Sequence, residues 1–170
     1  MIVIREAIEH EFEFIRRQRI TAYKQYEHAV PAEHLKVLLK AISSEITVEN
    51  GVEYLVAESD GAVAGSVVLF PPRSDAYEGL TGALDYPEIR MLVVDTQFRQ
   101  QGIGKSLIEE CINRSQKKGF PSIGLHTADF MKSAVKLYER LGFIRLPQFD
   151  FVPLDDGIVV KAYHFDLTTI

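Results

Sequence analysis

Gly102 and Gly104 follow a short apolar run and open a helical segment, an arrangement that can bind an anion. The first N–H groups of a helix have no partner inside the helix, and the positive end of the helix dipole lies there. Glycines at this place let the oxygens of a pyrophosphate approach the bare backbone. Taken alone, the glycines favour a simpler interpretation, a tight strand-to-helix turn, because short glycine patterns are common.

The elements that must hold these glycines are indicated by the flanking sequence, residues 86–119. Apolar residues from Ile89 to Val94, bounded by Pro87 and Asp95, predict a short buried strand. After Gly102, apolar residues recur at four- and five-residue steps and predict one face of a helix that ends before Gly119. This face comprises Ile103, Leu107, Ile108, Cys111 and Ile112.

Two motifs give the glycines a more specific interpretation. Arg99-x-x-Gly102-x-Gly104 after a strand resembles the acyl-CoA-binding signature of the GNAT superfamily of N-acetyltransferases. Residues 134–143, a helix with Tyr138 followed by Gly142-Phe143, are similar to that family's other signature. The two motifs occur in the family's order and at its usual separation, and together they are far more specific than either alone. The resemblance extends from about residue 1 to 167 and is strongest over 88–143.

The resemblance implies acetyl-CoA as cosubstrate and no metal. The backbone of Leu92–Val94 would pair with the pantetheine arm, and the N–H groups of residues 100–105 would hold the pyrophosphate, with charge from Arg99 and Lys105. The implied cofactor-binding residues are Leu92, Val93, Val94, Arg99, Gln100, Gln101, Gly102, Ile103, Gly104 and Lys105. At one position the chain departs from the family: Met131 replaces a frequent cofactor-contacting Asn, for which Ser133 or Asp129 are the candidate substitutes.

The reaction implied is transfer of the acetyl group to a primary amine, on a small molecule or a peptide, by direct attack in a ternary complex. A lysine-like amine titrates near 10.4, so about one in two thousand is neutral at pH 7 and a general base is useful. Glu88 begins the central strand where several family members carry a glutamate base, although acidic residues at strand starts are commonly just solvated. Asp85 and His126 are weaker alternatives. Tyr138 matches the family's tyrosine that protonates the departing thiolate, and a cofactor contact alone is its other interpretation.

Composition narrows the classes of protein. A length of 170 residues predicts one acyl-CoA N-acyltransferase domain over residues 1–170. The net charge of −5 argues against nucleic-acid binding. No apolar run is long enough to span a membrane, and acidic residues near the N-terminus argue against a signal peptide, so we expect a cytoplasmic protein. The single cysteine, Cys111, offers neither an internal disulfide nor a zinc set and is expected in the core. The sequence is compatible with a homodimer.

The remaining segments predict the rest of the fold. Strands are expected at 1–6, 54–58, 62–70, 122–127 and 143–146, and helices at 9–29, from Pro31 onward and at 131–141. Asp60-Gly61 predicts a hairpin turn, and Asp156-Gly157 predicts another between 148–152 and 158–167. Residues 71–86 are predicted to form a long loop. This order matches the GNAT arrangement: an α/β (α+β) fold with a mixed, strongly twisted sheet of about seven strands and helices on both faces.

Two other functions are alternatives to acetyl transfer. A non-catalytic acyl-CoA-binding sensor or interaction module on the same fold agrees equally well with the motifs. A general nucleotide-binding protein does not, because the chain has neither a G-x-x-x-x-G-K-[ST] loop nor a G-x-G-x-x-G pattern at this turn. The sequence leaves the identity of the amine acceptor open, since the segments expected to contact it lie outside both motifs.

Overall fold

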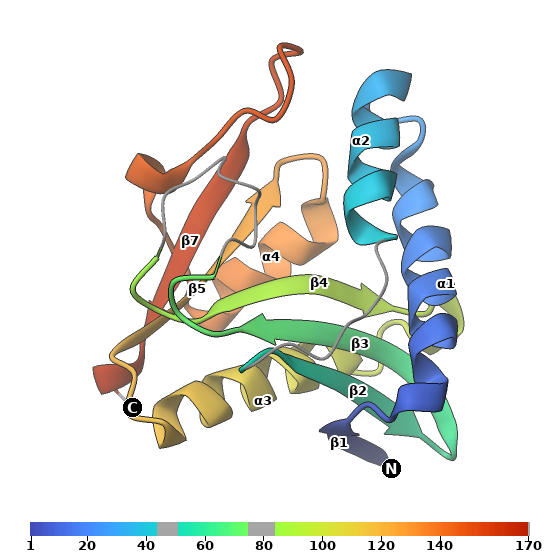
Figure 1. Ribbon diagram of the computed structural model, residues 1–170, viewed down its shortest axis with the longest axis vertical. Coiled ribbons are helices and arrows are strands. Elements are labelled where there is room, and N and C mark those ends of the chain that lie inside the picture. Colours follow the sequence, from blue (N-terminus) through green and yellow to red (C-terminus); the bar gives the residue numbers. More distant parts are fainter. Residues whose placement is uncertain (44–50, 75–83, 170) are drawn as a thin grey trace. The chain divides into compact units, whose positions relative to one another are not determined.

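The computed structural model describes residues 1–43, 51–74 and 84–169 (Figure 1). Within them the chain forms strands and α-helices in an order that agrees closely with the sequence-based prediction. They are β1 (Ile2–Glu6), α1 (Phe12–Tyr23), α2 (Ala32–Ile42), β2 (Glu53–Ser59), β3 (Ala62–Phe70), β4 (Glu88–Val94), α3 (Ile103–Lys117), β5 (Ser122–Ala128), α4 (Lys132–Leu141), β6 (Ile144–Arg145) and β7 (Val160–Asp166).

The strands form one seven-stranded sheet in the order β1-β2-β3-β4-β5-β7-β6. β4 and β5 pair in parallel, with Glu88 opposite Gly124 and Ile89 opposite Leu125. A parallel pair needs a crossover, and α3 lies between these two strands in the chain. The pairs β1·β2, β5·β7 and β6·β7 are antiparallel. The predicted mixed α/β sheet is therefore confirmed.

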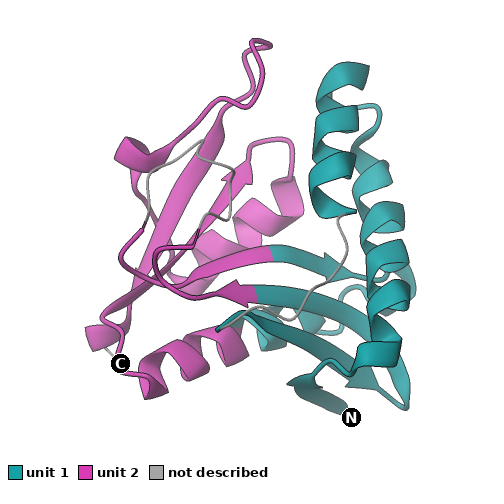
Figure 2. Cartoon of the chain, in the orientation of Figure 1, with its two compact units in different colours: residues 1–68, 91–108 teal, residues 69–90, 109–170 magenta. Residues whose placement is uncertain are grey.

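The chain divides into two compact units (Figure 2). Unit 1 comprises residues 1–68 and 91–108, and unit 2 comprises residues 69–90 and 109–170. Apolar side chains from β2, β3 and the start of α3 are buried in unit 1, among them Leu55, Val67 and Leu107. In unit 2 the buried residues include Ile123, Leu125 and Cys111. Cys111 is a core residue, as its place on the apolar face of α3 predicted.

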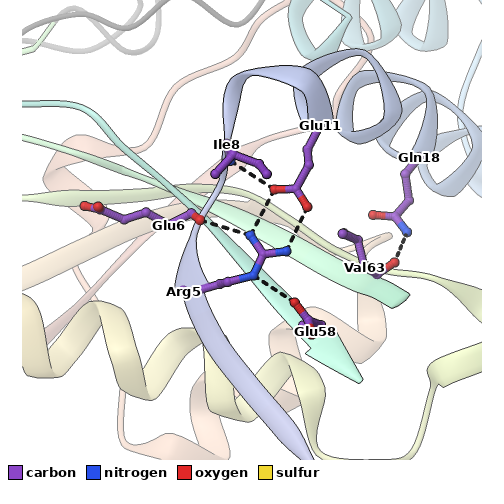
Figure 3. Close-up of polar contacts among 7 residues, drawn as sticks. All are labelled: Arg5, Glu6, Ile8, Glu11, Gln18, Glu58 and Val63. Carbon is purple, nitrogen blue, oxygen red and sulfur yellow. Dashed lines mark hydrogen bonds and ion pairs between the residues drawn. The ribbon is translucent and has the colours of Figure 1, made fainter. Parts of the chain in front are cut away.

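Arg5 joins the first strand to the segment that starts α1 (Figure 3). Its guanidinium donates two hydrogen bonds to the Glu11 carboxylate, at 2.9 and 2.8 Å, and a third to Glu58 Oε2 at 2.9 Å. Glu11 Oε1 also accepts from the N–H of Ile8 at 2.9 Å. Further along α1, Gln18 Nε2 donates to the carbonyl of Val63 in β3 at 3.1 Å. These bonds fix α1 to the strands of unit 1.

We expect Arg5→Met to lower the free energy of unfolding by about 1–2 kcal/mol at pH 7, because charge-assisted bonds to two carboxylates are lost. The hydrogen bond from Arg5 is the main reason that the pKa of Glu11 lies below its usual 4.5. A lowered folded-state pKa stabilises the fold above the unfolded pKa, and that stability is lost as pH falls. Chemical denaturation across pH should therefore show wild type and variant converging below about pH 4.5.

Arg17→Met is the control for this measurement. It removes an ion pair with Glu13 on the same helix, but Arg17 is 76% exposed and the pair is largely hydrated. We expect a change within about 0.5 kcal/mol. Equal losses for Arg5→Met and Arg17→Met would contradict the special role assigned to Arg5.

The two predicted hairpins have different outcomes. Asp60 and Gly61 have φ angles of 50° and 86°, the consecutive left-handed residues of a type I′ turn, and this prediction is confirmed. The hairpin of 148–152 with 158–167 is confirmed only in part. The two arms share an isolated antiparallel bridge between Phe151 and Val160, and the last strand forms as β7. The first arm is not a strand, because residues 147–149 form a 3₁₀ helix, and β7 pairs with β5 and β6. Pro147 and the ion pair of Arg145 with Asp150 favour a turn here.

Two further expectations changed in detail. The helix expected at 9–29 is divided into a 3₁₀ helix at Glu9–Glu11, α1, and a second 3₁₀ helix at Lys24–Tyr26. The central part of the loop predicted at 71–86 lies outside the described residues. The described ends of this segment are joined by a hydrogen bond, because the N–H of Arg73 donates to the carbonyl of Leu84 at 2.7 Å.

Candidate active site

The end of β4 is held firmly where the chain leaves the sheet. The N–H of Asp95 donates to the carbonyl of Ala64 at 2.8 Å, and its carboxylate accepts from the N–H of Gln97 at 3.0 Å. That second bond caps a 3₁₀ helix at Thr96–Phe98. The chain therefore enters the following turn from a fixed direction.

Residues 99–105, here called the amide turn, have the backbone of an anion site. Gln100 and Gly102 are left-handed, with φ angles of 62° and 79°. Such residues turn successive N–H groups toward one side of the chain. The side of Gly102 that a Cβ would occupy is open, with no described heavy atom within 4 Å.

The first turn of α3 continues this arrangement. Its intrahelical hydrogen bonds begin with Ser106 N–H to the carbonyl of Gly102, at 3.0 Å. The N–H groups of Ile103 and Gly104 precede this bond, so helix geometry gives them no intrahelical acceptor. A backbone donor set at a helix N-terminus suits the oxygens of a diphosphate. The residues present therefore fit the pyrophosphate of coenzyme A.

Gly65 in β3 permits the close packing that supports the amide turn. A Cβ at Gly65 would lie 2.5 Å from the carbonyl oxygen of Val93 and 3.3 Å from Cγ2 of Ile103. Any larger residue would therefore push the end of β4 or the start of α3 out of place. Gly65 was not among the residues predicted for the site. A glycine inside a predicted strand is the signal that could have found it.

The predicted cationic residues of the amide turn are both exposed. Arg99 donates to Gln25 Oε1 at 3.0 Å and so contacts the 3₁₀ helix Lys24–Tyr26. Burial raises the pKa of Tyr26 in that helix, and the positive charge of Arg99 opposes the shift. The charge of Arg99 is therefore held beside residues 25 and 26.

Glu88 and His126, two of the three candidate bases, are in contact. Nδ1 of His126 lies 3.2 Å from Oε1 of Glu88, and the two side chains are 0% and 5% exposed. Nε2 of His126 lies 2.8 Å from the carbonyl oxygen of Phe149. A carbonyl can only accept, so Nε2 carries a hydrogen. Asp85, the third candidate, is exposed and forms an ion pair with Arg73 at 3.3 Å.

Gly124 makes room beside Glu88. A Cβ there would lie 2.4 Å from Cε2 of Tyr86 and 3.2 Å from Oε1 of Glu88. Burial raises the pKa of Tyr86 above its usual value, and the charge of Glu88 adds to the shift, so the phenol stays neutral at physiological pH. Gly124 was not predicted as part of the site.

Met91 was also not predicted as a site residue. It lies inside β4 with a φ of 56°, a conformation that non-glycine residues rarely adopt in a strand. Such strain persists where the surrounding structure imposes it, and it is frequent at functional sites.

Tyr138 is a buried residue of α4, and its ring packs against Phe143 with centroids 5.9 Å apart. The helix ends at Gly142, which has a φ of 103°, as the second motif predicts. At the start of the helix, Sδ of Met131 accepts a hydrogen bond from Thr127 at 3.6 Å. Asp129, one candidate substitute for the missing Asn, forms an ion pair with Lys161 at 2.6 Å.

The predicted site residues divide between the two units. Leu92–Val94 and the amide turn lie in unit 1, and Glu88, His126 and Tyr138 lie in unit 2. Among the described residues, no group of three His, Cys, Asp or Glu side chains is placed to hold a metal ion. No helix in the described ranges has the length and hydropathy to cross a membrane.

Comparison with known sequences shows the family to which this chain belongs. The model of the Acetyltransferase (GNAT) family matches residues 10–143, more than half of the chain. A probable N-acetyltransferase camello from Xenopus tropicalis is 29% identical over 116 residues, which are 68% of this chain and 49% of that protein. The chain thus spans about half the length of the curated relatives it matches first.

Solved structures show the same fold. An acetyltransferase of the GNAT family from Staphylococcus aureus Mu50 has a TM-score of 0.68 and 19% identity, covering 98% of this chain and 99% of that one. The PaiA N-acetyltransferase from Thermoplasma acidophilum, solved in complex with coenzyme A, has a TM-score of 0.68 and 17% identity, covering 97% and 99%.

Proposed function

Because the chain belongs to the acetyltransferase (GNAT) family, we propose that it transfers an acetyl group from acetyl-CoA to an amine acceptor. The observation that carries the proposal is the amide turn: left-handed residues 100 and 102 lead into the N-terminus of α3 directly after β4. A backbone anion site in this place suits a diphosphate. A structural neighbour solved with coenzyme A supports the same ligand.

The residues proposed to hold acetyl-CoA are Leu92–Val94 along the pantetheine arm and residues 99–105 around the diphosphate. When bound, acetyl-CoA supplies the thioester whose acyl group is transferred. The backbone N–H groups of Ile103 and Gly104 would donate hydrogen bonds to the negatively charged diphosphate, and Arg99 adds a cation at the edge of the turn. Each charge-assisted bond contributes on the order of 1.5–3 kcal/mol, so several can bind the ligand without a basic surface.

Glu88 is the proposed general base. Its carboxylate accepts one proton from the acceptor's ammonium group, which frees the nitrogen lone pair to form the new N–C bond. His126 keeps its own hydrogen bonds and orients the carboxylate through the 3.2 Å contact. Tyr138 is proposed to give its phenolic proton to the sulfur that leaves when the C–S bond breaks.

We expect Tyr138→Phe to lower kcat by about a hundredfold, the lower end of general-acid contributions. A thiol titrates near 8.5, so the thiolate is a fair leaving group and a general acid can add only a limited rate enhancement. The ring and its contact with Phe143 remain, and the Kd for acetyl-CoA should change little. Steady-state kinetics at saturating acceptor test this, and an unchanged kcat would remove the acid role.

A panel of amines with acetyl-CoA, read by thiol release, tests the function itself. Small primary amines, polyamines and peptides with a free N-terminus cover the acceptor classes. Acetyl-CoA-dependent thiol release and a mass increase of the acceptor support the enzyme. Tight acetyl-CoA binding without release from any acceptor would favour the alternative, a non-catalytic acyl-CoA-binding module.

Three properties complete the proposal. The 170 residues act as a single acyltransferase domain, which is cytoplasmic and does not bind nucleic acid. Support comes from the family match over residues 10–143 and from a net charge of −5, which disfavours polyanionic partners. A homodimer is compatible with this function, and sedimentation of the purified protein tests it.

A further inference from the structure

An ion pair outside the proposed catalytic residues is built into the surroundings of His126. Arg145 follows Ile144 in β6 and donates to both carboxylate oxygens of Asp150, at 2.8 and 2.6 Å. Such a bidentate pair fixes orientation as well as distance. The hydrogen bond from Arg145 is the main reason that the pKa of Asp150 lies below its usual value, so the carboxylate stays charged.

Both partners of this pair are also bonded to the backbone of Ala162. Nη1 of Arg145 donates to the Ala162 carbonyl at 2.9 Å, and the Ala162 N–H donates to Oδ1 of Asp150 at 2.8 Å. Ala162 lies in β7 directly opposite His126 of β5. The ion pair is therefore hydrogen-bonded to the backbone of the β7 residue that lies opposite His126.

The pair closes a short turn that presents one carbonyl group. Residues 147–149 form a 3₁₀ helix, in which Phe149 N–H donates to Leu146 and Asp150 N–H donates to Pro147, each at 3.1 Å. The carbonyl of Phe149 then accepts the hydrogen bond from Nε2 of His126 at 2.8 Å. The ring of Phe151 covers the imidazole, with centroids 5.2 Å apart.

This bond decides which nitrogen of His126 faces Glu88. With the hydrogen on Nε2 held by Phe149, Nδ1 is directed at the carboxylate. Nδ1 lies 3.2 Å from Oε1 and 3.5 Å from Oε2 of Glu88, so the orientation of the imidazole determines which ring atom the carboxylate meets.

We propose that Arg145 and Asp150 are positioning residues for acetyl transfer, which orient Glu88 by holding the Phe149 carbonyl against His126. The proposal rests on the proposed function, in which Glu88 is the general base. Neither residue touches the reacting atoms. Their effect passes through the Phe149 carbonyl to the imidazole and from there to the carboxylate.

Asp150→Ala is the main variant for the test. We expect kcat to fall about tenfold to a hundredfold, because a small misplacement of a catalytic group is costly. The Kd for acetyl-CoA should stay within about twofold, and Asp150→Asn should restore part of kcat because its carbonyl oxygen still accepts from Arg145 and Ala162. Glu110→Ala is the matched control: it removes an ion pair of similar exposure, with Arg114 on α3, and should leave kcat unchanged.

Nitrogen-15 NMR of the histidine rings gives a readout that needs no turnover. His126→Gln assigns the His126 signals among the five histidines of the chain. In the wild type we expect the hydrogen on Nε2, and in Asp150→Ala an exchanging mixture of ring forms. An unprotonated Nε2 in the wild type would overturn the proposal. A loss of kcat in Asp150→Ala with unchanged ring signals would also overturn it. The same holds if neither kcat nor the ring signals change in this variant.

The readouts separate this inference from the proposed function. If Asp150→Ala does not fold, the wild-type ring signals and Asp150→Asn decide the result. If no amine is acetylated by the wild type, the proposed function fails while the ring signals still test the hydrogen-bond geometry. A positioning role in catalysis is supported only when the ring signals and kcat change together.

Discussion

Replacing Glu88 by Gln should lower kcat by about a hundredfold to ten-thousandfold, the range that a positioned general base contributes. The amide retains the volume of the buried carboxylate and can donate to Nδ1 of His126, so the fold should survive. It cannot accept the acceptor's proton. The deficit should shrink as pH rises, because each unit supplies about tenfold more neutral amine until the amine's own pKa is reached.

The measurement is kcat as a function of pH at saturating acceptor, together with the Kd for acetyl-CoA by calorimetry. Glu13→Gln, an exposed change in α1, is the control for a carboxylate-to-amide substitution as such. Asp85→Asn tests the rival base. An unchanged kcat in Glu88→Gln, or a larger loss in Asp85→Asn, would assign the base role elsewhere.

Gly102→Val should weaken acetyl-CoA binding by about a hundredfold to ten-thousandfold. The new side chain occupies the open side of the amide turn and blocks two or more charge-assisted bonds, each worth about 1.5–3 kcal/mol. Calorimetry with acetyl-CoA measures the loss directly. Activity should fall mainly through KM for acetyl-CoA.

Gly119→Val is the matched control, because the two glycines flank α3 in nearly the same conformation. Their φ angles are 79° and 83°, and neither has a described atom within 4 Å of the Cβ position. A valine therefore pays a similar backbone penalty at either end of the helix, about 1–3 kcal/mol. Equal Kd values in the two variants would show that the diphosphate binds elsewhere.

Much of this fold could be predicted from local sequence. The apolar run at 89–94, the glycines that follow and the spacing of Ile103 to Cys111 specify a strand, a turn and a helix, which are β4, the amide turn and α3. The hairpin predicted around Asp156-Gly157, confirmed only in part, shows the limit of such reasoning. Asp156-Gly157 favours a turn, but strand partners depend on the whole sheet, and β7 pairs with β5 and β6.

The sequence by itself determined the family, the order of the elements and the residues of the amide turn, because periodicity, turn chemistry and motif spacing are properties of neighbouring residues. Only the tertiary structure decided which base candidates meet. Glu88 and His126 are 38 residues apart, and Glu88 lies beside Gly124 through the register of β4 with β5. The close approaches at Gly65 and Gly124, and the Phe149 carbonyl at His126, likewise depend on packing between distant segments, where local patterns carry no information about distance.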